Sequence, residues 1–120
     1  LQLRDNILFE SGKADLIDGS SEILDKINTL ISTLPNSIVI EGHTDNVPIS
    51  TSIYKDNWDL STARASNVLR YFTQLKGQDP TRFSAAGYGE YRPKVDNSTD
   101  ENRAQNRRVN ILIVSNNEEW

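Results

Sequence analysis

Asp45 and Arg64 are the two residues whose types and placement in this chain most suggest ligand binding. Asp45 follows an apolar run, and Arg64 lies 19 positions later, in the first turns of a predicted amphipathic helix. Because consecutive elements usually pack side by side, we expect one carboxylate and one guanidinium at the same rim. A ligand carrying both an ammonium and a carboxylate would find a partner for each charge there. The alternative, which the bare residues favour, is an ion pair that only tethers the loop to the helix.

Further contacts are expected close to this rim. Backbone N–H groups near Leu60 and Ser61, at the start of the helix, could donate to a ligand carboxylate, and the helix dipole favours an anion there. Thr44 is expected beside them. Trp58 could stack on a ligand or close over the loop as a lid, although an aromatic residue at a helix start more often packs against the protein.

The lone histidine, His43, does not make a metal or catalytic site. A zinc site needs three or four side chains, with nitrogen or sulfur prominent. There are no cysteines, which excludes thiolate ligands and a cysteine nucleophile. No serine lies in a nucleophile-elbow setting. We therefore predict no metal, no cofactor and no enzyme activity, and we expect His43 to form hydrogen bonds within the loop.

Composition narrows the possible partners. The net charge of -4 and the pI near 4.9 argue against nucleic-acid binding, which needs a concentrated positive face. The one basic cluster, Arg103, Arg107 and Arg108, is predicted to be a solvated face and a source of ion pairs. Arg107 and Arg108 could instead support the floor of the site from the third helix, with an ion pair to Glu41 or Asp45 as the equal alternative.

The apolar pattern predicts one domain over residues 1–120 with seven elements. An alternating strand covers 1–9, with Asp5 as the exception, and a helical stripe follows over 23–34, with Asp18 and Ser20 as N-cap candidates. The later elements are a strand at 37–42, a helix from Asn57 or Ser61 to Lys76, a strand at 83–89, a short helix to Asn106 and a strand at 109–114. Residues 116–120 are expected to fray.

The order β-α-β-α-β-α-β predicts an α/β (α+β) two-layer sandwich. Right-handed connections place the first three strands parallel and both long helices on one face of a mixed sheet. The last strand is apolar on both faces near its end, so we expect it in the middle, inserted between earlier strands. No apolar run approaches the length of a membrane span, and the chain reads as a domain excised from a longer protein.

Three motifs in order resemble the OmpA-like peptidoglycan-binding domain family: Gly42-His43-Thr44-Asp45, the segment 60–65 and the segment 97–109. Phe9-Glu10-Ser11-Gly12 resembles the opening motif of the family, so the likeness covers about residues 7–114. Segments 44–49 and 57–65 are most similar to the flagellar stator (MotB-type) branch. Two features differ from many relatives: Glu101-Asn102-Arg103 stands in place of Glu-Gly-Arg, and the loop 46–56 is longer than in outer-membrane relatives.

The resemblance implies non-catalytic binding of the peptidoglycan stem peptide, with Asp45 and Arg64 on its diaminopimelate. The other contacts it suggests are Thr44, Leu60, Ser61, Asn57, Phe9, Ser11 and Arg107. It also implies a periplasmic or extracytoplasmic location, an upstream membrane helix, a MotA-type channel partner and a homodimer, so that the domain anchors a motor stator to the cell wall. Open alternatives are an envelope-stabilising lipoprotein or porin domain, a peptidoglycan hydrolase and an acidic protein–protein adaptor.

Overall fold

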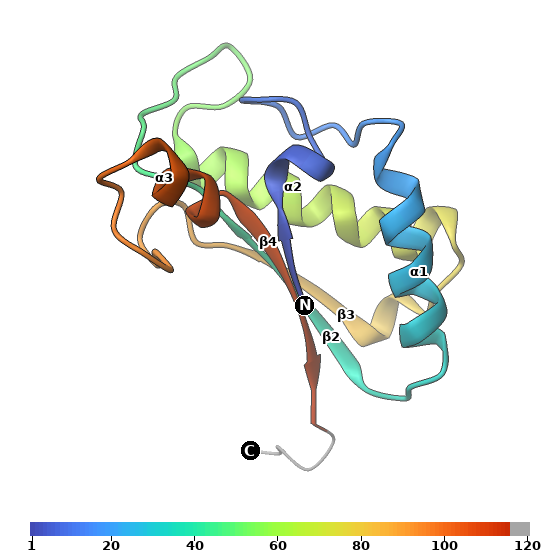
Figure 1. Cartoon of the computed structure of the whole chain (residues 1–120). Helices are drawn as coiled ribbons and strands as arrows, with labels where there is room; N and C mark the ends of the chain where they lie inside the picture. The colour runs from blue at the N-terminus through green and yellow to red at the C-terminus, as the bar shows by residue number, and fades with distance from the viewer. Residues whose placement is uncertain (116–120) are drawn as a thin grey trace.

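A computed structural model describes residues 1–115, so the expectation for 116–120 lies outside the described residues. The predicted order of elements is confirmed (Figure 1). The elements are β1 (Gln2–Arg4), α1 (Ser20–Ser32), β2 (Ser37–His43), α2 (Asn57–Arg70), β3 (Phe83–Gly87), α3 (Asp100–Asn106) and β4 (Arg108–Val114).

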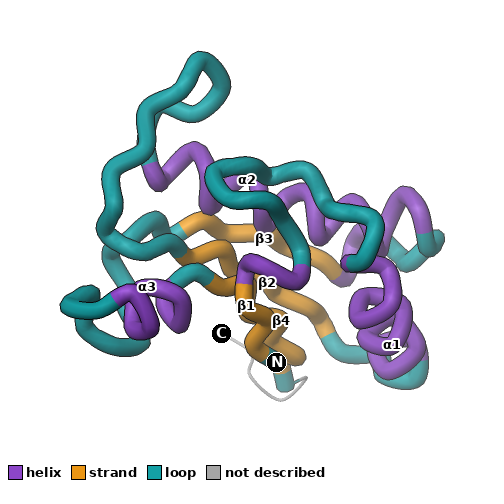
Figure 2. The backbone as a smooth tube through the Cα atoms, turned by 45° about the horizontal axis from the view of Figure 1, so that its top comes forward, coloured by secondary structure: helices purple, strands orange, loops and turns teal. Residues whose placement is uncertain are grey.

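The four strands form one mixed sheet in the order β1-β4-β2-β3. β2 and β3 are parallel, while β4 runs antiparallel to both β1 and β2. The last strand is therefore inserted between the first two, as predicted. α1 and α2 lie on the same face of the sheet, and the loop 46–56 projects from the body of the molecule (Figures 1 and 2). The two-layer α+β prediction is confirmed.

The hydrophobic core lies between this face of the sheet and the two long helices. The α1 stripe points inward through Leu24, Ile27 and Ile31, whereas Leu30, also predicted in the stripe, is 45% exposed. Alternate residues of the two central strands meet the helices, because side chains on a strand point to opposite faces in turn. The other core residues of these elements are Ile38, Ile40, Ala65, Val68, Phe72, Val109 and Ile111.

Two glycines set the position of α2 over the sheet. Gly42 and Gly87 are register partners on β2 and β3. A Cβ at Gly42 would lie 2.1 Å from the Ser61 carbonyl oxygen, and one at Gly87 would lie 2.5 Å from the Thr62 nitrogen. The backbone of α2 therefore rests directly on the sheet here, which is possible only because neither strand carries a side chain at this point.

The first strand is shorter than predicted, because it ends at Arg4 and a 3₁₀ turn follows over Asp5–Ile7. The N–H groups of Leu8 and Phe9 both donate to the Asp5 carbonyl, at 3.0 and 2.8 Å. The Asp5 N–H donates to the Arg107 carbonyl. The turn thus places a buried carboxylate where an alternating strand would have continued.

The helix starts also differ in detail from the predictions. α1 has Gly19 at its N-cap position and no side-chain cap, so neither Asp18 nor Ser20 caps it; the Ser20 hydroxyl donates to the Ile17 carbonyl instead. α2 is capped by Asp56, whose carboxylate accepts the Asp59 N–H, and not by either predicted residue. α2 continues as a π-helical turn over Tyr71–Leu75. The short helix α3 forms as predicted, with Thr99 as its cap.

Replacing Gly42 by alanine should destabilise the fold by about 1–3 kcal/mol or more, because the added methyl group meets α2 backbone that cannot move alone. Urea unfolding measures the change. Gly19→Ala is the matched control, since its Cβ has no atom within 4 Å. Because alanine is otherwise favoured over glycine in a strand, a neutral or stabilising Gly42→Ala would contradict the close contact.

Candidate functional site

A cavity of about 620 Å³ opens where the end of β2, the start of α2 and the segment before α1 meet. α3 and the loop 46–56 complete its walls. Eight of the nine residues predicted from the sequence line it: Phe9, Ser11, Thr44, Asp45, Asn57, Leu60, Arg64 and Arg107. Elements that are far apart in the chain therefore bring the predicted residues to one place.

Arg64 lies at the bottom of the cavity and is only 3% exposed. Its guanidinium donates to the Asp5 carboxylate at 3.1 Å and to the carbonyls of Lys13 and Glu10, at 2.8 and 3.2 Å. It also lies over the Phe9 ring, 4.7 Å from the centroid. Burial lowers the pKa of Arg64, and the charge of Asp5 partly offsets this. Arg64 therefore joins α2 to the segment 5–13 as well as facing the cavity.

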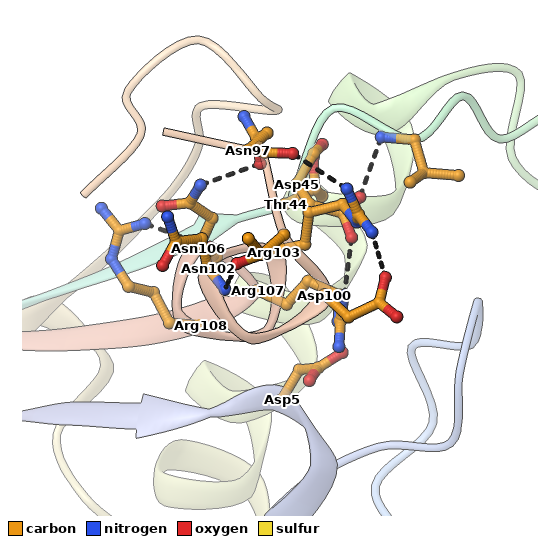
Figure 3. Close-up of polar contacts among 12 residues, drawn as sticks. Asp5, Thr44, Asp45, Asn97, Asp100, Asn102, Arg103, Asn106, Arg107 and Arg108 are labelled. Carbon is orange, nitrogen blue, oxygen red and sulfur yellow. Dashed lines mark hydrogen bonds and ion pairs between the residues drawn. The ribbon is translucent and has the colours of Figure 1, made fainter. Parts of the chain in front are cut away.

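Asp45 does not pair with Arg64, contrary to the tether alternative. One of its oxygens accepts the Val47 N–H at 3.0 Å, and the other lies 2.7 Å from the Arg107 guanidinium (Figure 3). Burial acts to lower the pKa of Arg107, but the hydrogen bond that it donates to Asp45 and the charge of Asp5 outweigh burial, so the pKa is raised. The ion pair weighed for Arg107 is therefore confirmed with Asp45.

Asp5 connects the two arginines and was missed as a site residue. Its carboxylate lies 3.1 Å from the Arg64 guanidinium and 3.5 Å from that of Arg107. The order of charges across the cavity is thus Asp45, Arg107, Asp5, Arg64, an alternation with no net charge. The available signal was Asp5 itself, a charged residue at an apolar position of the alternation in the first strand, because a buried carboxylate needs a cation nearby.

α3 adds a second pair of charges to the lining. Asp100 and Arg103 form an ion pair one turn apart, and Arg103 also donates to the Asn97 carbonyl at 2.9 Å (Figure 3). The Asp100 side chain is almost fully exposed, so this pair is open to solvent. The cavity therefore has a buried charged floor and a solvent-exposed charged edge, where the ion pair is weak.

Ser61 is the predicted contact that the structure places elsewhere. It is fully buried, does not line the cavity, and its hydroxyl accepts the Gly89 N–H at 3.0 Å. The donor role expected near Leu60 is also wrong, because the Leu60 N–H donates to the Asp56 carbonyl. The physical reason is that α2 begins at Asn57, so residues one turn later are already inside the helix.

Thr44 and Asn57 hold the backbone of the site in place. The Thr44 N–H donates to the Gly89 carbonyl, and its hydroxyl donates to the Asp45 carbonyl at 2.8 Å. The Asn57 amide donates to the Val47 carbonyl at 3.1 Å, which fastens the loop 46–56 to the start of α2. Both residues line the cavity, but most of their polar groups already have partners within the protein.

One side of the cavity is apolar. Leu60 and Phe9 belong to the buried core side, and the loop 46–56 contributes Val47, Pro48 and Ile49. Val47 is 53% exposed although it borders the cavity. An apolar wall facing a row of charges suits a ligand with an aliphatic chain and charged end groups.

His43 and Trp58 lie outside the lining of this cavity. His43 is buried at the end of β2, where its Nε2 lies 3.2 Å from Glu41 and its ring stacks on Tyr88. Trp58 stacks on Tyr91 with ring centroids 4.8 Å apart, which fits the packing interpretation. Within residues 1–115 no group of acids and histidine could hold a metal ion, and no helix there has the length and apolarity to cross a membrane.

The fold and cavity define a small α+β domain with a neutral, charge-lined site at one end of its sheet. Residues 8–107 match the OmpA family, and the chain belongs to that family. It is similar to Motility protein B of Bacillus subtilis, at 42% identity over 95% of this chain and 44% of the relative. The protein YtxE of the same organism, described as uncharacterized, is 44% identical over 94% of this chain and 47% of its own length.

Solved structures agree with this placement. The cell wall anchor of the T6SS from Pseudomonas aeruginosa has a TM-score of 0.88 at 36% identity, covering 93% of this chain and 78% of that one. The periplasmic domain of Helicobacter pylori MotB has a TM-score of 0.87 at 29% identity, covering 96% and 74%. The chain is thus an OmpA-like domain close to MotB, and it spans less than half the length of the curated relatives described above.

Arg64→Ala should lower the free energy of unfolding by about 3 kcal/mol, because it leaves Asp5 buried with only the longer contact to Arg107. Urea denaturation provides the measurement, with Arg70→Ala, an exposed arginine on the same helix, as control. Equal stability of the two variants would contradict the role of Arg64 in joining α2 to the segment 5–13.

Stability should fall as the pH drops below about 6.5, in part through His43. Burial is the main cause that lowers its pKa below the ordinary value of 6.5, although Glu41 acts against it. At low pH the unfolded chain then binds more protons than the folded one. The contribution of His43 to folding stability is therefore fully present above pH 6.5 and is lost as the pH falls toward the pKa of the folded state. The imidazole of this sole histidine can be titrated by NMR.

The control is His43→Gln, whose unfolding free energy should change less than that of the wild type between pH 7 and 5.5. A histidine midpoint above 6.5 would contradict the assigned direction.

Proposed function

We propose that the cavity binds peptidoglycan through the free end of diaminopimelate in the stem peptide. That end carries an ammonium and a carboxylate on one carbon, joined to the peptide by an aliphatic chain. The ammonium would be taken by Asp45 and the carboxylate by Arg64 and Arg107, through charge-assisted hydrogen bonds. The apolar wall of Phe9 and Leu60 suits the methylene groups.

The observation that carries this proposal is the alternation of two aspartates and two arginines in one cavity. Arg107 has the more exposed guanidinium, at 36% against 3% for Arg64. We therefore assign Arg107 the outer contact with the carboxylate and Arg64 the inner one. Membership of the OmpA family and the similarity to the cell wall anchor of the Pseudomonas aeruginosa T6SS support the same ligand.

The finer proposal is that the domain anchors a flagellar stator unit to the wall, outside the cytoplasmic membrane. The similarity to Motility protein B and to a periplasmic domain of MotB supports this assignment. A MotA-type partner, a membrane helix elsewhere in the full protein and dimerisation belong to the same proposal. The second candidate is wall anchoring of another envelope assembly, which the T6SS anchor favours by its TM-score of 0.88.

We propose binding without catalysis. Ser11 lines the cavity but His43 does not. The His43 ring contacts Glu41 and stacks on Tyr88 at the end of β2. A hydrolase would also need an attacking group aimed at a bond of the ligand, and the proposed contacts hold only its charged end. Incubation of the domain with purified sacculi should release no muropeptides, and their appearance in solution would revive the hydrolase alternative.

Asp45→Asn should weaken sedimentation of the domain with purified sacculi about tenfold or more. The substitution keeps the size of the side chain but removes the charge that would meet the ammonium, worth about 1.5–3 kcal/mol. Asp18→Asn, which removes the same charge from an exposed site, is the matched control. Sacculi whose diaminopimelate carboxylate is amidated should bind the wild type weakly. Full binding by Asp45→Asn would exclude the proposed contact.

The stator assignment is tested by exchanging domains. The corresponding segment of Motility protein B in Bacillus subtilis would be replaced by residues 1–120, with and without Asp45→Asn. Restored swimming with the native segment and lost swimming with the variant would support the stator role. If the chimera binds the wall but does not support motility, the general anchor becomes the better assignment.

A further inference from the structure

A second, smaller hollow of about 180 Å³ lies apart from the charged cavity and has a different electrostatic character. It is lined by β1, by the loop before α3, by α3 itself and by the first residue of β4. Its cationic residues are Arg4, Lys94 and Arg108, and the amide side chains of Gln2 and Gln105 complete the polar lining. No acidic residue of the described chain lines it, although the protein carries a net charge of -4.

Arg108 is the buried member of this group, at 7% exposure. Its two terminal nitrogens donate only to backbone carbonyls, those of Asn106 and Arg92, each at 3.1 Å. Its Nε is buried and makes no hydrogen bond within the described residues. A buried guanidinium without a carboxylate partner and with an unused donor is costly, so the site lacks an acceptor that would complete it.

Glu41 does not supply that acceptor. Burial lowers the pKa of Arg108, and the charge of Glu41 offsets this only in part. The Glu41 carboxylate is already contacted by His43 and Asn110, at 3.2 and 3.3 Å. The positive charge of Arg108 is therefore largely uncompensated by the protein, and an anion in the hollow would compensate it.

The register of the sheet brings a second arginine to the same face. Arg4 on β1 is the direct partner of Arg108 on β4. Like charges placed opposite each other on neighbouring strands destabilise a sheet, unless something negative lies between them. Lys94 adds a third positive charge, held by Gln2, whose side-chain oxygen accepts from the ammonium at 3.0 Å. Three cations in this arrangement form a donor-rich cradle for one anion.

Consecutive arginines of the Asn-Arg-Arg sequence thus have different surroundings. Arg107 meets Asp5 and Asp45, whereas Arg108 extends away from them on the other side of α3 (Figure 3). The hollow is too small for a peptide but has room for one tetrahedral oxyanion. Arginines bind phosphate oxygens through paired N–H donors, and lysine adds a point charge.

We propose that Arg4, Lys94 and Arg108 form a phosphate-binding site, separate from the charged cavity and independent of its proposed ligand. The phosphate group occupies the hollow and bridges the guanidinium groups of Arg108 and Arg4 across the strand pair. The Arg108 Nε–H, which protein atoms cover in the free protein, turns toward the phosphate as it binds. The source is either a free phosphate or phosphomonoester, or a phosphodiester in a polymer. Both present the same oxygens to the site.

The test is a titration of ¹⁵N-labelled domain with inorganic phosphate at pH 7.5, at constant ionic strength made up with chloride. The Nε–H resonance of Arg108 should shift with saturation, and the melting temperature should rise with phosphate concentration. The Arg4→Gln/Lys94→Gln double variant should bind at least tenfold more weakly and remain folded, because both side chains are exposed. Lys26→Gln/Arg70→Gln is the control of equal charge and should bind like the wild type.

Three results would overturn the site: no saturation with phosphate, equal effects of phosphate and chloride, or equal weakening in the two double variants. Glycerol phosphate and a glycerol phosphodiester distinguish the sources. Binding of the monoester alone indicates a small phosphate, and binding of the diester as well indicates a polymer; either result supports the site.

Discussion

The carboxylate of Asp5 is the contact on which the charged cavity depends. It is buried, and it lies between the guanidinium groups of Arg64 and Arg107, which come from α2 and from the residue just before β4. The two arginines would repel each other without a negative charge between them. One 3₁₀ turn at the end of β1 therefore allows a helix and a strand from distant parts of the chain to present their positive charges to the same space.

Close packing of α2 on the sheet makes that geometry possible. Gly42 and Gly87 let the helix backbone rest on β2 and β3, which fixes its height above the sheet end where Asp45 follows. Because Arg64 lies on the same helix, its reach toward Asp5 is set by this contact. The packing of the α2 backbone and the position of the Arg64 charge are thus coupled. A shift of α2 that relieved the close contact with the sheet would move Arg64 away from Asp5.

Element types and their order follow from hydrophobic periodicity, and so does the inserted last strand, because a strand apolar on both faces needs neighbours on both sides. Eight of the nine residues predicted as ligand contacts also line the charged cavity. Their partners were not predictable: which acid meets Arg64 depends on where β1 stops, and a single aspartate within an apolar alternation does not reveal that the chain turns there. Ser61 was misplaced because the Asp56 cap starts α2 before either residue predicted as its cap. Helix starts depend on local side-chain hydrogen bonds that several neighbouring residues can make.

In the proposed binding mode, the alternating charges favour a zwitterion over a simple anion. An anion that draws the Arg107 guanidinium away from Asp45 leaves a buried carboxylate without its cation. Such a loss costs several kcal/mol, comparable to what the new contact provides. A ligand with both charges gives Asp45 an ammonium and Arg107 a carboxylate. Two charge-assisted contacts then replace one, and no buried charge is left unpaired. In this proposed mode the neutrality of the cavity is a source of selectivity, because it disfavours ligands that carry only a positive or only a negative charge.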